Sequence, residues 1–430
     1  MATSEDASWP AGGETGLPAR DRRSGPYRTY LPDPLGYRPL VIDPSLSRRI
    51  AQVERAVRDL AGGSTGADLE GLSRFLLRSE AVASSFIEGI APSSANVAVA
   101  ELAQTEHVQR VGEQARLVAR NITIVRRATE ELVALDEVGV DDVVRLQSSL
   151  IPEERHHGIR LVQNWIGGSN RHPLDAQFVP PSPDHVDGLM ADLVDYLNGS
   201  HHSPLVQAAL VHAQFETIHP FTDGNGRVGR ALIHTVLARR GLTRQAVLPI
   251  SLVLSTLRDE YVQGLTWFRF EGPAGAEAAV TGTQRWIETF VEAAAAAVRQ
   301  AAELVAAVGA LRREWDERLA RYRTQQGVRE VPRAGSATAR LLALLPEAPV
   351  VTARTVERVL GVSYPAANTA VQELEGAGIL GSRQLERGTT GYLATEVLDL
   401  VDLTERRLAG TAFDTRTSPP NRPVPARREA

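Results

Sequence analysis

A twelve-residue stretch, His219 to Arg230, constrains the fold of this chain more than any other feature. It reads HPFTDGNGRVGR, and its first eight residues hold one proline and two glycines, which favour a tight loop. Before it, Leu205 to Ile218 repeats apolar side chains at helical spacing, and after it an apolar stripe runs to Gly241. The pattern therefore predicts two helices joined by a short loop, with the second helix beginning at the loop.

The start of this second helix carries two arginines, Arg227 and Arg230. Free backbone N–H groups and the helix dipole favour an anion there, and each cation opposes the dipole by roughly 0.3–1 kcal/mol. A bound polyanion would remove that penalty, so the pattern predicts a phosphate site. Asp223 offers one hard oxygen ligand for a Mg²⁺ that phosphates otherwise hold. His219 is the candidate general base, because it is the nearby group that titrates near neutrality.

These twelve residues match every defined position of the Fic core motif, His-Pro-Phe-x-Asp/Glu-Gly-Asn-Gly-Arg-x-x-Arg, so the chain resembles the Fic family. Fic proteins mostly transfer AMP from ATP to a hydroxyl group of a target protein. The resemblance implies that His219 takes the proton from that hydroxyl and that Asp223 holds Mg²⁺. It further implies that the rest of the motif binds the triphosphate: Gly224, Asn225 and Gly226 the α- and β-phosphates, Arg227 the β-phosphate, and Arg230 the γ-phosphate.

A second motif, SSFIEG, lies upstream at residues 84–89, in the second of two helices predicted over Pro44 to Ala61 and Ala67 to Ile87. Taken alone, Glu88 reads as a solvated charge at a helix end, where it opposes the dipole by about 0.3–1 kcal/mol. The motif resembles the Fic inhibitory motif, Ser/Thr-x-x-x-Glu-Gly/Asn, which here matches Ser84, Glu88 and Gly89. The resemblance implies an N-terminal inhibitory helix whose Glu88 pairs with Arg230 and blocks the γ-phosphate position.

A segment between the two motifs predicts a hairpin with a long loop. It runs over residues 158–168, with a glycine pair at its end, and returns at Phe178 to Pro181. It resembles the Fic flap, which holds the target in an extended form by strand addition. The resemblance implies four target-binding residues, Trp165, Ile166, Gly167 and Gly168; an ordinary surface hairpin is the alternative.

Beyond the core motif, helices are expected over Leu252 to Phe268 and Gln284 to Arg299, followed by a charged linking helix over Ala301 to Arg323. Tyr261 lies in the first of these helices. By resemblance it can border the adenine of ATP, and by its residue type it can equally pack in the core.

Residues 336–405 predict a separate unit of three short helices followed by a segment with glycines at 381, 388 and 391, and this unit resembles the winged-helix domain of many Fic proteins. The expected recognition helix, Pro365 to Gly376, has two glutamates and no arginine. Because phosphate contact needs a basic face, this favours a protein-interaction role, such as homodimer formation, over DNA binding by the winged helix.

Composition sets further limits on this chain of 430 residues, which has room for two or three domains. The absence of cysteine excludes disulfides and thiol catalysis. No apolar run approaches 18 residues and the first 40 residues lack a signal-peptide pattern, so we expect a cytoplasmic protein without membrane contact. A formal net charge of −5 gives no general reason to expect nucleic-acid binding.

The expected fold class is all-α, a mainly helical Fic core with a short β-hairpin flap, plus a C-terminal winged helix-turn-helix domain. The expected organisation is a mostly disordered lead-in (1–40), N-terminal helices with the inhibitory helix (41–97), the Fic core (98–300), a linking helix (301–335), the winged-helix domain (336–405) and a disordered tail (406–430).

The function expected from these patterns is that of an autoinhibited protein adenylyltransferase. It would use ATP as co-substrate and Mg²⁺ as cofactor, and would modify a Ser, Thr or Tyr hydroxyl of a target protein and of itself. Two alternatives stay open: an enzyme that removes AMP or transfers another nucleotide, and a winged-helix transcriptional regulator that only senses nucleotide. The intact His219 argues against the regulator, since a sensor could lose its base.

Overall fold

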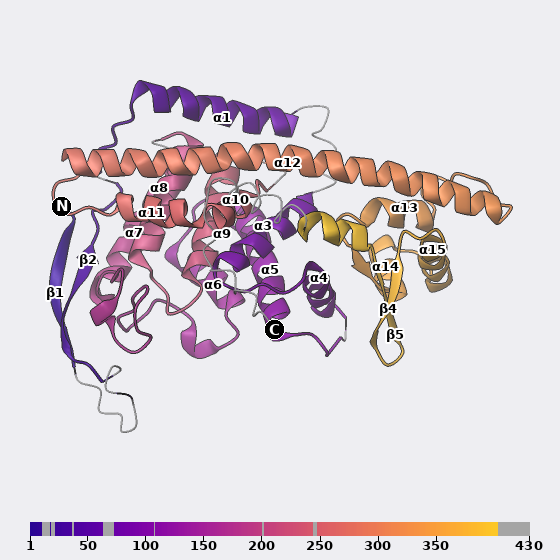
Figure 1. Ribbon diagram of the computed structural model, residues 1–430, viewed down its shortest axis with the longest axis horizontal. Helices are drawn as coiled ribbons and strands as arrows, with labels where there is room; N and C mark the ends of the chain where they lie inside the picture. Colours follow the sequence, from indigo (N-terminus) through magenta and orange to yellow (C-terminus); the bar gives the residue numbers. More distant parts are fainter. Residues whose placement is uncertain are drawn as a thin grey trace, which may run out of the picture.

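The computed structural model describes residues 1–10, 18, 22–36, 38–62, 73–106, 108–199, 202–243 and 247–402. This part of the chain is mainly helical, with two small antiparallel sheets (Figure 1). The mainly helical class predicted from the sequence is confirmed. Two predictions lie outside the described residues: the first turns of the helix expected from Ala67, and the tail over 406–430.

The centre of the fold is the helix pair α8 (Pro204–Ile218) and α9 (Asn225–Arg239). All residues of α8 are buried, because ten of its fifteen side chains are apolar and neighbouring helices pack around it. On one side α7 (Pro183–Asn198) packs against α8; on the other, α5 (Glu113–Ala134) packs against α9 and contacts α6 (Val140–Leu150). The loop between α8 and α9 is therefore fixed at both ends by the most buried helices of the protein.

One long helix, α12 (Glu277–Gln325), runs nearly the full length of the molecule, with α1 (Pro44–Gly62) alongside it (Figure 1). The prediction of two separate helices on either side of residue 300 is wrong, since one helix crosses that point, while the domain boundary placed there stays a prediction. The alanine-rich run across that point has strong helix propensity and contains nothing that breaks a helix. Conversely, the helix expected over Leu252 to Phe268 is divided at Leu257, whose ψ of 43° is not helical, into α10 (Ile250–Thr256) and α11 (Arg258–Phe268).

Helix α12 is also long and apolar enough to cross a membrane, by length and composition alone. Its large apolar side chains are buried, among them Trp286, Phe290 and Trp315. It packs against α1, α8, α10 and α11. These contacts are those of a core helix.

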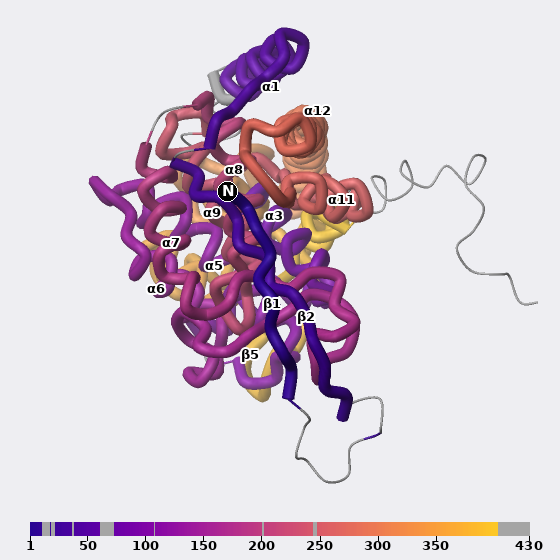
Figure 2. The backbone as a smooth tube through the Cα atoms, turned by 90° about the vertical axis from the view of Figure 1, so that its left-hand side faces the viewer, coloured from indigo at the N-terminus to yellow at the C-terminus, as the bar shows by residue number. Residues whose placement is uncertain are grey.

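The N-terminal segment forms a two-stranded antiparallel sheet, β1 (Thr3–Trp9) with β2 (Gly25–Leu31), at one end of the molecule (Figure 2). The prediction of a disordered lead-in is wrong for these strands. The polar composition of residues 1–27 suggested disorder, but backbone pairing from Thr3–Leu31 to Trp9–Gly25 orders both segments. The Tyr30 N–H also donates to the Val179 carbonyl at 3.0 Å, which joins this sheet to the expected flap.

In the sequence, α1 is followed by α3 (Ser73–Ile87) and α4 (Ser94–Ala103). Helix α3 packs against α5, α9 and α10, so it lies directly on the central pair. Gly89, with a φ of 79°, ends the helical region in a left-handed turn that suits glycine.

The C-terminal unit contains α13 (Ala337–Leu344), β3 (Val350–Val351), α14 (Ala353–Leu360), α15 (Tyr364–Gly376), β4 (Gly381–Glu386) and β5 (Thr389–Leu393). Its sheet has the order β3-β5-β4. The end of α12 holds this unit: the Trp315 indole N–H donates to Glu396 at 2.8 Å, and Arg318 pairs with the same carboxylate at 2.7 Å. The winged-helix assignment stays a prediction.

Candidate active site

The loop between α8 and α9 has a strained entrance and a tightly held interior. His219 adopts a left-handed conformation, with φ 49° and ψ 59°, and is the only non-glycine residue with positive φ in the described chain. Asn225 holds the interior, because its Oδ1 accepts from the Phe221 N–H at 2.9 Å and its Nδ2 donates to the Phe221 carbonyl at 2.8 Å. The Asn225 side chain is thus part of the loop's own structure, and an anion would meet backbone N–H groups here.

Arg160 holds the start of the loop between α8 and α9, and the sequence did not predict this role. It is almost fully buried, and its guanidinium donates to four backbone carbonyls, those of Val162, Pro181, Ile218 and His219. Its own backbone N–H donates to the Pro220 carbonyl at 2.9 Å. Burial lowers the Arg160 pKa to about 10, which leaves it charged at neutral pH. One buried cation therefore joins the expected flap to the His219 turn.

Replacing Arg160 with methionine is expected to lower the free energy of unfolding by about 2–4 kcal/mol, because several buried carbonyls lose their donor. Urea unfolding of the variant and the parent protein measures this difference. The exposed Arg110 offers a matched control, since Arg110→Met removes no hydrogen bond in the described structure and should change stability by less than about 0.5 kcal/mol. Equal stability of the two variants would contradict the role given to Arg160.

The surroundings of the His219 imidazole favour its neutral form. Its side chain is only 19% exposed, and Nδ1 lies 3.9 Å from a carboxylate oxygen of Glu216, too far for a hydrogen bond. Burial lowers the pKa of His219 to about 4, with the charges of Arg269 and Arg160 acting in the same direction and Glu88 opposing them. At neutral pH the ring is free to accept a proton.

Arg227, on the first turn of α9, is a buried cation with unused hydrogen-bonding capacity. One terminal nitrogen, Nη2, lies 3.3 Å from Asp223, while Nε and Nη1 are buried without a partner. Burial lowers the pKa of Arg227, although Asp223 and Glu88 oppose that shift. Buried donors without acceptors are unfavourable, so a bound anion would relieve this position.

Arg230 is fully engaged by the end of helix α3. Its Nε donates to Ser84 Oγ at 2.9 Å, and its Nη2 donates to the Ser84 carbonyl at 2.7 Å and to Glu88 Oε1 at 2.8 Å. Burial alone would lower the Arg230 pKa, but Glu88, Tyr261 and Glu216 outweigh it and the pKa is raised. Burial alone would raise the Glu88 pKa, but Arg230 outweighs it and the pKa is lowered. Both groups are therefore charged, and the contact expected from the two motifs is present.

The Glu88 carboxylate also lies against the glycine turn of the loop. A side-chain carbon at Gly226 would collide with Glu88 Oε1, so the two residues are in direct contact. The carboxylate is 38% exposed, which means that it closes this position without being sealed inside the protein. An anionic group thus occupies the space beside Gly226 and Arg230.

A further acidic residue, Glu216 of α8, lies close to His219, and the sequence reasoning did not predict it. It is buried on α8, and burial raises its pKa to about 7, with Arg230 and Arg269 opposing and Glu88 adding to the shift. Its Oε1 has no hydrogen-bond partner in the described structure. At neutral pH a part of this carboxyl is protonated, so the arginines around the loop give the site a positive balance.

Tyr261 lies in the core and not at an open edge of the site. Its ring is buried, and its hydroxyl meets His212 Nε2 at 2.8 Å while the two rings stack at 5.8 Å. Of the two roles left open by the sequence, this burial supports packing and opposes contact with adenine.

The expected flap is less regular than predicted. A single antiparallel bridge joins Ile166 to Phe178, and no hairpin strands form over residues 158–181. Gly167 and Gly168 both have positive φ, 76° and 73°, and turn the chain immediately after the bridge. A short 3₁₀ turn at Glu154–His156 precedes the segment, and another at Pro173–Asp175 lies within it.

The β1–β2 sheet supports this segment. The Trp165 indole N–H donates to the Ser169 carbonyl at 2.6 Å, and its ring meets Trp9 of β1 edge-on at 5.3 Å. The four predicted target-binding residues thus lie together beside the N-terminal sheet, a neighbour that the sequence did not predict.

The expected Mg²⁺ ligand, Asp223, is well placed for a shared metal ion. Its side chain is 58% exposed at the start of α9, and it is a single hard ligand next to a phosphate-type site. The described residues contain no group of three or more His, Cys, Asp or Glu side chains that could hold a metal by themselves. Asp223 therefore suits a Mg²⁺ bound mainly by phosphate and water.

Residues 137–237 match the model of the Fic/DOC family. The chain therefore carries a Fic/DOC family domain, which includes helices α6 to α8 and most of α9. A Fic family protein from Desulfovibrio desulfuricans G20, known from its crystal structure, has the same fold. The TM-score is 0.50 at 22% sequence identity, over 83% of this chain and 98% of that one.

Curated relatives match part of the chain. Protein adenylyltransferase fic-1 of Caenorhabditis elegans is 30% identical over 167 residues, which are 37% of this chain and 28% of that protein. A probable protein adenylyltransferase of Aquifex aeolicus (strain VF5) is 39% identical over 85 residues, 20% of this chain and 27% of that protein. The chain thus spans less than a third of the length of these relatives.

Proposed function

We propose that this protein transfers AMP from ATP to a hydroxyl group of a target protein, and to a hydroxyl of its own chain. The observation that carries the proposal is the pair of buried arginines at the start of α9, Arg227 with two unpartnered nitrogens and Arg230 held by a displaceable carboxylate. A neutral histidine at the entrance of the same loop supplies a base. The names of the curated relatives, protein adenylyltransferases, support the same activity.

In this proposal the chain's residues position the triphosphate and the target hydroxyl and neutralise the charge of the phosphates, as phosphoryl transfer requires. Backbone N–H groups from Gly224 to Gly226 and the guanidinium groups of Arg227 and Arg230 bind the triphosphate. His219 takes the proton of the target hydroxyl, whose oxygen forms the new bond to the α-phosphorus as the bond to pyrophosphate breaks. A Mg²⁺ held by Asp223 and the phosphates would neutralise charge on the triphosphate when bound.

We further propose that Glu88 inhibits this activity. Its carboxylate holds the Arg230 guanidinium and lies against Gly226, so the γ-phosphate of ATP and Glu88 compete for one position. Ser84 supports the inhibited state, because its hydroxyl and carbonyl orient the same guanidinium.

The target is proposed to bind along the flap. Beside the bridge between Ile166 and Phe178, the Val179 carbonyl already accepts from Tyr30 of β2. The Trp165 backbone has no such partner in the described structure, so it is the edge proposed to pair with an extended segment. The β1–β2 sheet, which touches Trp165, would then widen the surface that a target meets.

Incubation with labelled ATP, GTP, UTP or CTP, followed by mass spectrometry of the modified proteins, tests the proposed function. We expect an AMP adduct on a Ser, Thr or Tyr hydroxyl. Adducts of another nucleotide only, or no adduct in any reaction, would contradict it.

The rate of transfer should depend on pH as a histidine of low pKa requires. Because the neutral ring is the base, His219 should stay active from about pH 8 to about pH 5 and be lost as the base only as the pH approaches about 4. Glu216, whose pKa is raised to about 7, titrates within that range, so the profile is measured in a Glu216→Gln background. The Glu88→Gly variant at limiting ATP is the form to measure, since Glu88 itself titrates and raises the His219 pKa. A midpoint near 6.5, the ordinary value for histidine, would contradict the role of burial.

The C-terminal unit is proposed to bind protein and not DNA. Helix α15 has no arginine, and its Glu373 is occupied by Arg323 of α12 and by Thr338. The full chain is therefore expected to bind random duplex DNA with a Kd weaker than about 10⁻⁶ M even at about 50 mM salt. Fluorescence anisotropy with labelled duplexes measures this, and tight, sequence-specific binding would overturn the expectation.

A further inference from the structure

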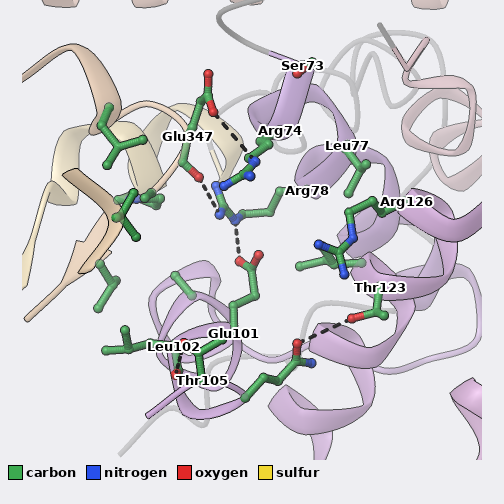
Figure 3. Close-up of a pocket in the computed structure, with 18 of the residues that line it drawn as sticks. Ser73, Arg74, Leu77, Arg78, Glu101, Leu102, Thr105, Thr123, Arg126 and Glu347 are labelled. Atoms are coloured by element: carbon green, nitrogen blue, oxygen red, sulfur yellow. Dashed lines mark hydrogen bonds and ion pairs between the residues drawn. The ribbon is translucent and has the colours of Figure 1, made fainter. Parts of the chain in front are cut away.

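A cavity of about 460 Å³ lies between the first turns of α3 and the C-terminal unit. Helices α4 and α5 form its other walls, and β3 and α14 close it from the C-terminal side (Figure 3). The volume lies within the range of sites that bind small organic molecules. None of the described lining residues belongs to the loop between α8 and α9, so this is a second site.

Two arginines direct unused nitrogen atoms at this cavity. Arg78 is buried on α3, where Nε donates to Glu101 at 2.6 Å and Nη2 donates to the Glu347 carbonyl at 3.0 Å, while Nη1 is buried without a partner. Arg126 of α5 reaches into the same space (Figure 3), and its guanidinium has no hydrogen bond or ion pair in the described chain. Guanidinium groups with free donors are well suited to a carboxylate or a phosphate.

The charge balance of the lining also favours an anion. Four arginines, at positions 74, 78, 126 and 358, face three glutamates, at positions 101, 130 and 347. Glu101 is held by Arg78, and the Glu347 carboxylate lies 3.7 Å from Arg74. Arg358 donates only to Thr105, which is neutral, so one positive charge is left in excess.

The remaining wall of the cavity is apolar. Its side chains come from both parts of the protein and include Leu77, Leu102, Ile122, Val247, Val350 and Val356. An apolar wall with a few convergent charged groups is typical of a site for an amphipathic small molecule.

We propose that this cavity binds a small organic anion, a carboxylate or phosphate ester with an apolar body, whose charged group is held by Arg78 and Arg126. The ligand contacts the first turns of α3, and Glu88 directly follows the C-terminal end of the same helix. Arg78 and Glu88 are ten residues apart, about 15 Å along a helix. A ligand that moves the first turns of α3 therefore acts on the contact between Glu88 and Arg230, and this regulatory part rests on the proposed function.

Calorimetry on the full chain tests the site without any assay of activity. The probes are 1-naphthoate and 1-naphthyl phosphate, with the uncharged 1-naphthalenemethanol as the matched control. We expect one anion or both to bind with one-to-one stoichiometry and at least tenfold more tightly than the alcohol. The anion that binds more tightly identifies the charged group that the site prefers.

Two variants locate the binding. Arg126 is exposed, so the Arg126→Ala variant should fold normally, and its Kd for the anion should be at least tenfold weaker. Arg227→Ala, which alters the loop before α9, should leave the probe's Kd unchanged. The proposal is overturned if the alcohol binds as tightly as both anions, or if Arg126→Ala has no effect.

The regulatory part has a separate readout. A saturating amount of the bound probe should change self-labelling of the wild type at least twofold and leave that of Glu88→Gly unchanged. An unchanged wild-type rate, with the probe bound, refutes the coupling to Glu88. A protein without transferase activity would fail the proposed function, while the calorimetry would still decide whether the cavity is a site.

Discussion

Replacing His219 with alanine is expected to lower the rate of AMP transfer by about 10²–10⁴-fold while ATP binding stays near normal. The residue lies in the strained turn at the end of α8, and its buried ring is neutral at neutral pH. The nitrogen groups available to the triphosphate come from other residues, namely the backbone at the start of α9 and Arg227. Rates of labelling and the Kd of ATP, measured separately, distinguish the two effects.

His172 supplies a control for the loss of an imidazole. It is buried in the loop of the flap segment, between Gly168 and Phe178, and His172→Ala should lower transfer much less than His219→Ala. A His219→Ala protein that transfers AMP at the wild-type rate would remove His219 from the mechanism. A loss of ATP binding equal to the loss of rate would make it a binding residue.

Replacing Glu88 with glycine is expected to raise self-labelling and target labelling at least tenfold, which corresponds to about 1.4 kcal/mol. In the wild type the carboxylate holds Arg230 at 2.8 Å and lies against Gly226. Its removal frees the guanidinium for the γ-phosphate and leaves His219 in place. Labelling with radioactive ATP, compared at equal protein concentration, measures the gain.

Two further variants show whether the gain depends on this contact. Glu88→Gln keeps the volume and removes the charge, so it should shift activity in the same direction. The double variant Glu88→Gly with Arg230→Ala should lose the gain, because the anion-binding group is then absent. If Glu88→Gly is no more active than the wild type, Glu88 is an ordinary charge at a helix end. A gain of the same size in Glu137→Gly, which removes an exposed carboxylate elsewhere, would also count against inhibition.

Local patterns predicted the helix pair at the centre of the fold. Helical spacing located α8 and α9 to within a residue or two, and the proline and glycines between them indicated the loop. The contact between Glu88 and Arg230 spans 142 positions of sequence, and only the resemblance of two short motifs made it predictable.

The residues missed by the sequence act through contacts between distant segments. Arg160 has no local pattern that marks it, because its acceptors come from three separate parts of the chain. The β1–β2 sheet depends on backbone pairing, which a polar composition does not reveal. The continuity of α12 differs from the two helices predicted from the sequence because helix propensity continues across residue 300.

The most direct test of the proposed activity follows the fate of two phosphates of ATP in the Glu88→Gly protein. Parallel reactions contain ATP labelled at the α-phosphate or at the γ-phosphate, and the label retained on the protein is measured after denaturation. AMP transfer predicts that the α-label becomes covalently bound to a hydroxyl side chain and that the γ-label leaves in pyrophosphate. Retention of the γ-label, or of neither label, would contradict the account.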